Sequence, residues 1–399
     1  MRRAEAKTVR RDVRLDEVCG IASVLVDPRK SQYQEMIHVG GANIESATGV
    51  LGNLMTAREE ALKSGKFLFD ESMVLYSKIR PYLMKVARPD FCGLCSADVY
   101  PLSPDRTQLD RGYLFYLLLT TEFTEFAIAG SARAGMPKVN RDHLFGFRLS
   151  LPSLPEQRRI VGILDEAFEG IATAKANAEK NLQNARALFE SHLQSVFTKT
   201  DSSHVERKLD DVCTEITVGH VGSMAKQYRN EGIPFLRSQN IRAFHVSLEN
   251  VVFIDKSFHQ SLAKSQLRPG DVAVVRTGYP GTAAVIPDSL PISNCSDLVI
   301  VRPGPDADPH YLALFFNSTM GKELVAGRIV GAAQKHFNVT AAKLVSISFP
   351  PIPEQHRLVT KIKVFAAETD RLASIYQQKL AALDELKKSL LHQAFSGQL

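Results

Sequence analysis

The chain contains one segment twice, at a constant spacing. The stretch LPEQRRIVGIL (154–164) returns as IPEQHRLVTKI (352–362), 198 residues later. The register then holds without a gap as far as Phe197, which falls on Phe395. Repeats of about 20–50 residues are typical of solenoids, whereas this one takes half of a 399-residue chain. The repeat therefore predicts a duplicated domain pair with pseudo-twofold symmetry, facing a ligand that itself has two halves.

The charge and composition are those of an ordinary globular protein with a mild basic excess. The net charge of +6 permits a polyanionic partner, although many cytosolic proteins share such a balance. The N-terminus is basic but has no apolar core, so we do not expect a secretory signal. No run of 18 uncharged apolar residues occurs, so no membrane-spanning helix is expected. Five scattered cysteines fit a reducing compartment, and we expect a cytoplasmic protein.

The only CxxC motif is Cys92-Gly-Leu-Cys95. A structural zinc site needs two further ligands at suitable spacing, and none lies nearby in the sequence. We therefore expect no metal and interpret the pair as two buried thiols.

Each copy divides into a mixed α/β part and a long helix. Dense turn residues bound short apolar runs, which predict strands at 67–70, 73–79, 271–277 and 297–303. One amphipathic helix is expected before the end of each α/β part, at 111–126 and 309–324. We predict an α+β chain with four segments: α/β domains at 1–150 and 205–350, and helical regions at 151–204 and 351–399.

The two helical regions have the composition of long rods. No proline occurs from Glu156 to about Phe197, or from Glu354 to about Phe395. Steps of four and three residues give an alanine-rich seam in the first copy: Ile160, Leu164, Ala167, Ile171, Ala174, Ala178, Asn181, Ala185, Leu188 and His192. The same steps in the second copy give Leu358, Ile362, Phe365, Thr369, Leu372, Tyr376, Lys379, Leu383, Leu386 and Leu390. We expect the rods to pair as an antiparallel coiled coil; the alternative is that each packs only on its own α/β domain.

The motifs of common enzymes are absent. The sequence has no GxxxxGK[ST], GxGxxG, HExxH or GxSxG pattern, and no Asp/Asn-Pro-Pro-aromatic run. The eleven histidines fall in no recognisable metal or triad spacing. We therefore expect a binding protein with no catalytic residues and no cofactor of its own.

Polar clusters follow apolar runs at matching places of the two copies. Arginine and lysine pair with guanine or phosphate, while glutamine and asparagine bridge adenine in the major groove. The alternative is that they are solvated turn residues, and Asn240 and its counterpart Asn43 can simply close turns. The candidate DNA-contacting residues are Lys78, Arg80, Tyr82, Lys138, Asn140, Arg237, Ser238, Gln239, Asn240, Arg276, Thr277, Tyr279, Gln334, Lys335 and His336.

At Leu154-Pro-Glu-Gln and Ile352-Pro-Glu-Gln, each opening a long helix, the chain resembles the specificity subunits of type I restriction-modification systems. The ending Leu391–Leu399 is also similar to that family's. The resemblance covers essentially the whole chain. It implies two target-recognition domains, each reading one half of a split, asymmetric site in double-stranded DNA, with the paired helices setting the gap.

The resemblance also implies the partners. Two modification subunits would dock on the helices and carry adenine-N6 methyltransferase chemistry with S-adenosylmethionine, and restriction subunits would add translocation and cleavage. A different hypothesis is a coiled-coil scaffold that holds two protein-binding domains and has no DNA role.

Overall fold

The computed structural model describes all residues except 1–9, 22–23, 132–135, 199–201, 225 and 328–336. The chain forms two compact units. The first comprises residues 1–178 together with 378–399, and the second comprises residues 179–377. Each unit therefore contains one α/β domain and a part of both long helices, α5 (Leu154–Thr198) and α11 (Ile352–Ser396).

The α/β domain of the first unit contains three small sheets. Their strand orders are β1-β11, β2-β10-β7-β8 and β3-β6-β9-β4-β5. The strands are β1 (Arg11–Arg14), β2 (Cys19–Gly20), β3 (Leu25–Val26), β4 (Ile37–Val39), β5 (Met55–Thr56), β6 (Lys66–Phe69), β7 (Val74–Ser77), β8 (Val86–Ala87), β9 (Gly93–Cys95), β10 (Val99–Pro104) and β11 (Arg148–Leu151). The helices are α1 (Leu15–Val18), α2 (Arg111–Leu117), α3 (Thr121–Ala129) and α4 (Arg141–Phe145), with 3₁₀ turns η1 (Ser31–Tyr33) and η2 (Pro81–Leu83).

The domain of the second unit repeats this plan. Its strand orders are β12-β23, β13-β22-β19-β20, β17-β14-β21-β18 and β15-β16. The strands are β12 (Val205–Lys208), β13 (Cys213–Val218), β14 (Ile233–Leu236), β15 (Ile241–Arg242), β16 (His245–Val246), β17 (Val252–Ile254), β18 (Gln266–Leu267), β19 (Val272–Val275), β20 (Ala283–Val285), β21 (Ser293–Cys295), β22 (Leu298–Pro303) and β23 (Ser346–Phe349). The helices are α6 (Leu209–Val212), α7 (Lys256–Ser261), α8 (Pro309–Asn317), α9 (Thr319–Ala326) and α10 (Val339–Lys343), with 3₁₀ turns η3 (Ser238–Asn240) and η4 (Ala263–Ser265).

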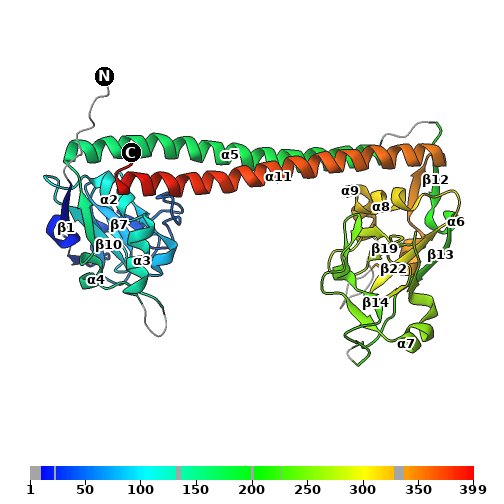
Figure 1. Cartoon of the computed structure of the whole chain (residues 1–399). Coiled ribbons are helices and arrows are strands. Elements are labelled where there is room, and N and C mark those ends of the chain that lie inside the picture. The colour runs from blue at the N-terminus through cyan, green and yellow to red at the C-terminus, as the bar shows by residue number, and fades with distance from the viewer. Residues whose placement is uncertain (1–9, 22–23, 132–135, 199–201, 225, 328–336) are drawn as a thin grey trace, which may run out of the picture. The chain divides into compact units, whose positions relative to one another are not determined.

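The internal repeat and the α+β class predicted from the sequence are confirmed. The sheet β2-β10-β7-β8 corresponds to β13-β22-β19-β20, and the parallel pair β4-β9 corresponds to β14-β21. The four predicted strands are present as β6, β7, β19 and β22, of which Figure 1 labels the last three.

The predicted single helices at 111–126 and 309–324 are wrong, because each is two helices. In the first unit the Thr120 side chain accepts a hydrogen bond from the Phe123 N–H, so α3 begins with its own N-cap. Ser318 does the same for α9 by accepting from Gly321. Such caps stabilise a helix start by about 1 kcal/mol. A hydrophobic period alone does not reveal a break at a hydroxyl residue inside it.

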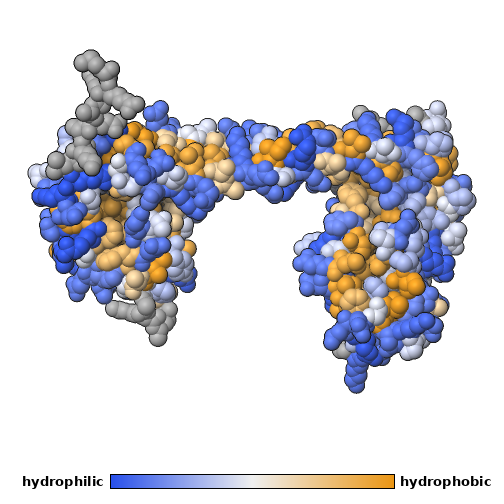
Figure 2. Space-filling model, viewed as in Figure 1, coloured by the Kyte–Doolittle hydropathy of each residue, from blue (hydrophilic) through white to orange (hydrophobic). Residues whose placement is uncertain are grey.

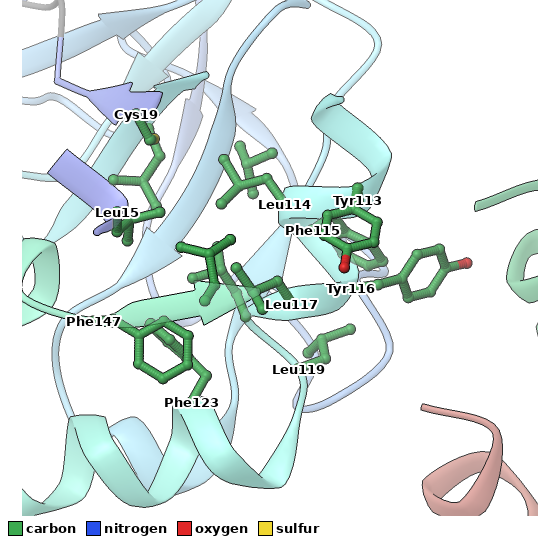
Figure 3. Packing of buried hydrophobic residues seen from close by; sticks show 14 of the residues in the cluster. Leu15, Cys19, Tyr113, Leu114, Phe115, Tyr116, Leu117, Leu119, Phe123 and Phe147 are labelled. Carbon is green, nitrogen blue, oxygen red and sulfur yellow. The ribbon is translucent and has the colours of Figure 1, made fainter. Parts of the chain in front are cut away.

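The core of the first unit forms around α2. Figure 3 shows its buried side chains converging with those of α1 and α3, including Leu15 and Phe123. Phe395, near the end of α11, completes this core by packing its ring 4.8 Å from that of Tyr113. In the second unit Phe197, near the end of α5, packs 5.3 Å from Tyr311 in the same way. Each α/β domain is thus closed by the helix that begins on the other copy.

The repeated Pro-Glu-Gln motif anchors the start of each long helix. Gln157 is fully buried, and its amide donates to the carbonyls of Gln108 and Pro152 while its Oε1 accepts from the Asp110 N–H. Gln355 is equally buried and makes the same three kinds of bond, to Asp306, Pro350 and Asp308. The glutamines satisfy backbone groups that would otherwise be buried without partners, which makes the motif structural.

The long helices pair antiparallel within each unit, as predicted. In the first unit Lys175 forms an ion pair with Asp384, and the Lys387 ammonium lies 4.9 Å from the Phe168 ring. In the second unit Phe365 stacks at 6.4 Å on Phe189. In these contacts, residues with higher numbers on α5 meet residues with lower numbers on α11, as an antiparallel pair requires. Figure 1 shows the helices side by side.

The predicted seams are partly wrong in phase. Ala178 is buried, but the next predicted residue, Asn181, is exposed, and Leu182 is the partly buried one. Leu188, Leu372 and Leu386 are 61%, 37% and 47% exposed. The cause is the mismatch between 3.6 residues per turn and the assumed 3.5, which lets a 4-3 pattern slip by one residue.

The cysteine prediction is half wrong, because Cys95 is buried but Cys92 is exposed. Among the described residues no group of three or more metal-ligating side chains occurs. None of the helices in the described part combines the length and apolarity of a membrane span. Figure 2 shows hydrophilic side chains over most of the visible face of each unit.

Candidate nucleic-acid interface

The candidate residues of the first unit gather around Asp98, in the turn between β9 and β10. Its carboxylate lies 3.3 Å from the Lys78 ammonium and 3.1 Å from that of Lys138. The two lysines are brought together because the Lys78 carbonyl accepts from the Val139 N–H at 2.9 Å. Burial lowers the pKa of Lys78, whose Nζ also donates to the Ala97 carbonyl. Burial alone would raise the pKa of Asp98, but bonds to the two lysines lower it overall.

The other three candidates of this unit have different environments. Arg80 has left-handed backbone (φ 51°), and its N–H donates to the Pro137 carbonyl, so it fixes the turn beside the lysines. Tyr82 is 51% exposed. Asn140 is the N-cap of α4, where its Oδ1 accepts from the His143 N–H at 2.8 Å. Arg80 and Asn140 are exposed as well.

The candidate loops of the second unit gather around Asp297, which also has left-handed backbone (φ 55°). Its carbonyl accepts from the Arg276 N–H and from the Ser238 hydroxyl, both at 3.4 Å. The Arg276 Nε donates to the Phe337 carbonyl at 3.1 Å. Loops that are separate in the sequence therefore meet at one edge of the domain, as they do around Asp98.

Two candidates of the second unit are occupied by internal bonds. Asn240 is fully buried; its Oδ1 accepts from the Arg237 N–H, and its amide donates to the Ser247 and Glu249 carbonyls. The Arg237 guanidinium donates to the Asn250 carbonyl and lies 5.7 Å from the Tyr228 ring. Asn240 closes its turn, which is the structural alternative considered from the sequence.

The first copy closes its turn in the same way. Asn43 accepts from the Gly40 N–H and donates to the Gly52 and Asn53 carbonyls. The shared asparagine therefore reflects a shared loop geometry.

The remaining candidates of the second unit are open to solvent. Gln239 is exposed, Thr277 is partly exposed, and Tyr279 is 83% exposed. Gln334, Lys335 and His336 lie outside the described residues.

Sequence reasoning missed two side chains that organise the first unit's cluster. Asp98 holds both lysines, and the Arg141 guanidinium lies 5.7 Å from the Tyr100 ring and 5.8 Å from the Phe67 ring. An aspartate in the turn after a short apolar run, and an arginine directly after an asparagine cap, were the available signals.

The arrangement suits recognition of an anionic, hydrogen-bonding surface. It combines cations, an exposed amide and exposed phenol rings, which can bind phosphates and base edges. Among the candidates that the structure describes, none is a nucleophile paired with a general base, which acyl or phosphoryl hydrolysis by side chains would need.

Comparison with known proteins gives one consistent family. The sequence profile described as "Type I restriction modification DNA specificity domain" matches residues 11–183. The EcoDI specificity subunit of Escherichia coli is 37% identical over 187 residues, covering 47% of this chain and 40% of that protein. The EcoKI specificity subunit of Escherichia coli (strain K12) is 22% identical over 328 residues, covering 77% of this chain and 68% of that protein. The first alignment thus spans less than half of the relative's length.

Solved structures share the fold over nearly the whole chain. The HsdS subunit from Thermoanaerobacter tengcongensis has a TM-score of 0.66 at 21% identity, covering 98% of this chain and 97% of that one. A chain from a structure of complex assembly and conformational transition of the type I R-M system has a TM-score of 0.82 at 21% identity, covering 99% of this chain and 100% of that one.

Proposed function

Because this chain belongs to the family of type I restriction-modification specificity subunits, we propose that it is a non-catalytic subunit that recognises a DNA sequence. The observation that carries the proposal is the recurrence of one loop cluster in both units, around Asp98 and around Asp297. Each cluster reads one half of a bipartite site. The half-sites differ in sequence, because the side chains that the two clusters present are different.

The candidate residues divide into two roles. Lys138, Gln239, Arg276 and Tyr279 have solvent-facing surface and contact the DNA, with Tyr82, Ser238 and Thr277 beside them. Lys78, Arg237 and Asn240 shape the loops through the internal side-chain bonds described above; Arg80 does so through its backbone and Asn140 through its helix cap, while both remain exposed. Contacts to phosphate set orientation and affinity, whereas contacts to base edges set the sequence.

The paired helices serve the rest of the complex. Two modification subunits, which carry the adenine-N6 methyltransferase and its S-adenosylmethionine, dock on them, and restriction subunits add cleavage. The exposed Leu188, Val364, Leu372 and Ile375 lie on the second unit's part of the helices and support a protein-binding role, because apolar side chains that gather at a protein surface are typical of protein-interaction sites. The complex works in the cytoplasm, where the cell's DNA lies.

A salt-titrated gel shift tests the DNA role. Purified chain is mixed with a labelled 40-base-pair duplex library, because the target sequence is unknown, and retention is measured at rising salt. We expect the logarithm of the affinity to fall linearly with that of the salt concentration, with a slope of about −0.9 for each phosphate contacted. A chain that binds no duplex at low salt would contradict the proposal and favour the coiled-coil scaffold without a DNA role.

A further inference from the structure

The second unit contains an apolar groove where its α/β domain meets the paired helices. Its volume is about 500 Å³, and α8, α11 and the loop before β16 form its walls. Its apolar lining includes Ala313, Leu314, Ile362 and Ala366, together with Phe189 of α5. Grooves of this size and character bury compact apolar groups.

The equivalent place in the first unit is filled by the chain's own aromatic side chains. With the repeat spacing of 198 residues, Ala366 corresponds to Phe168 and Leu314 to Tyr116. These two rings pack edge-on at 5.3 Å, and Figure 3 shows Tyr116 extending away from the other labelled core residues. Gly112 of α2 illustrates how full this place is, because a Cβ there would lie 2.6 Å from Val161. Its counterpart in the second unit is His310, which lines the groove.

The charges at the two places are also different. In the first unit Asp165 accepts a hydrogen bond from the Tyr116 hydroxyl at 2.6 Å and forms an ion pair with Arg88. In the second unit the repeat spacing of 198 residues places Lys363 where the first unit has Asp165. The pairing of β7 with β8 and of β19 with β20 places the apolar Val285 where the first unit has Arg88. Lys363 is exposed beside the groove, and none of the ion pairs among the described residues includes it. Lys363 is therefore a cation at the groove that none of the ion pairs in the described part of the chain neutralises, and Asp370, two helical turns further along α11, also lines the groove.

Phe244, which lines the groove beside Phe189, has an unusual backbone conformation. Its φ is +71°, a left-handed value that a bulky residue rarely adopts, and its side chain is 37% exposed. Strain of this kind persists at sites where a side chain is held for binding.

We propose that this groove binds an aromatic side chain of a partner protein, next to a carboxylate of the same partner. The aromatic ring takes the place that Phe168 and Tyr116 fill in the first unit, and the carboxylate pairs with Lys363. The site is a one-sided docking point, since the first unit has filled its own. The proposal does not depend on DNA binding.

The test uses blocked dipeptides with the full-length chain. N-acetyl-Glu-Phe-amide, N-acetyl-Lys-Phe-amide and N-acetyl-Glu-Ala-amide are titrated and followed by saturation-transfer NMR. We expect the Glu-Phe peptide to bind with a Kd of about 1–10 mM, as is reasonable for a ligand of this size. The other two peptides should bind at least about fivefold more weakly, because each lacks one of the two complementary groups.

Three variants locate the binding. Ala366→Phe installs the residue of the first unit and should abolish binding, while Ala381→Phe, the same change at an exposed position of the same helix outside the groove, should leave it unchanged. Lys363→Glu should reverse the preference toward the Lys-Phe peptide. A thermal melt of each variant confirms that it is folded.

The outcomes separate the possibilities. Failure of the parent chain to bind the Glu-Phe peptide, or equal binding by Ala366→Phe, overturns the proposal. Binding of free 3-phenylpropionate more than about tenfold tighter than the dipeptide would mean a small aromatic acid is the occupant, which also overturns it.

Discussion

Gln157 is expected to be the most sensitive polar residue of the first unit. Its side chain satisfies three backbone groups: the Asp110 N–H and the carbonyls of Gln108 and Pro152. Gln157→Leu keeps the volume roughly constant but removes all three bonds. A buried hydrogen bond contributes about 1 kcal/mol net, and an orphaned partner costs about 1–3 kcal/mol, so we expect a loss of about 3–5 kcal/mol after local relaxation.

Hydrogen exchange measures this loss where it occurs. A two-unit chain need not unfold in one step, so a single denaturation midpoint would average the units. The amides of α2 should exchange about 100-fold faster or more in Gln157→Leu, since about 1.4 kcal/mol corresponds to a factor of ten. The amides of α8, in the second unit, serve as the internal reference and should not change.

Two further variants complete the design. Gln355→Leu should produce the mirror result, with α8 affected and α2 unchanged, because Gln355 makes the equivalent bonds. Gln183→Leu, an exposed glutamine of α5, should change neither. Exchange of α2 within threefold of the parent in Gln157→Leu would refute the anchoring role.

Three other results are expected. Gln239→Ala and Arg276→Ala should each weaken specific binding by about 1–3 kcal/mol at one half-site only, as measured on duplexes with single base changes; equal binding to all duplexes would show that these are not the reading residues. Asp98→Asn should free Lys138 from its ion pair and steepen the salt dependence of binding by about one unit of slope, and an unchanged slope would mean that Lys138 does not reach phosphate. Seven residues inserted after both Ala178 and Gln377 keep the helix pairing in register and lengthen the paired helices by about 10 Å. The preferred gap between the half-sites should then grow by about three base pairs at 3.4 Å each. An unchanged optimal spacer length on duplexes of varied spacer would contradict the idea that the helices set this gap.

The sequence predicted well the features that depend on residues close together in the chain or on the internal repeat. The repeat, the strands β7 and β19 and the two long helices depend on runs of like residues, which periodicity detects. The helix breaks at Thr120 and Ser318 could not be predicted from the sequence, because one polar residue among apolar ones is also compatible with a continuous helix. Only the bonds that the two hydroxyls accept from the Phe123 and Gly321 N–H groups show that a new helix begins there.

The roles of the candidate site residues were the least predictable. Asn240 and Gln239 are neighbours of similar chemistry, yet one is fully buried and the other exposed. The difference is set by the carbonyls of Ser247 and Glu249, which only the folded loop brings to Asn240. The seam phase failed for a different reason, because the mismatch between 3.6 residues per turn and the assumed 3.5 accumulates along a helix of this length.

The closure of the first unit by Phe395 has a consequence for biosynthesis. Besides its ring contact with Tyr113, the Phe395 carbonyl accepts a hydrogen bond from Arg10 at 2.8 Å. The ribosome finishes residue 178 long before residue 378, and at about 5–20 residues per second the intervening 200 residues take about 10–40 s. During that time the nascent first domain exposes the apolar surface that α11 later covers, while the second unit emerges as one uninterrupted stretch. The domain made first is therefore the last to be completed, and its exposed core is where chaperone binding or proteolysis of the growing chain should concentrate.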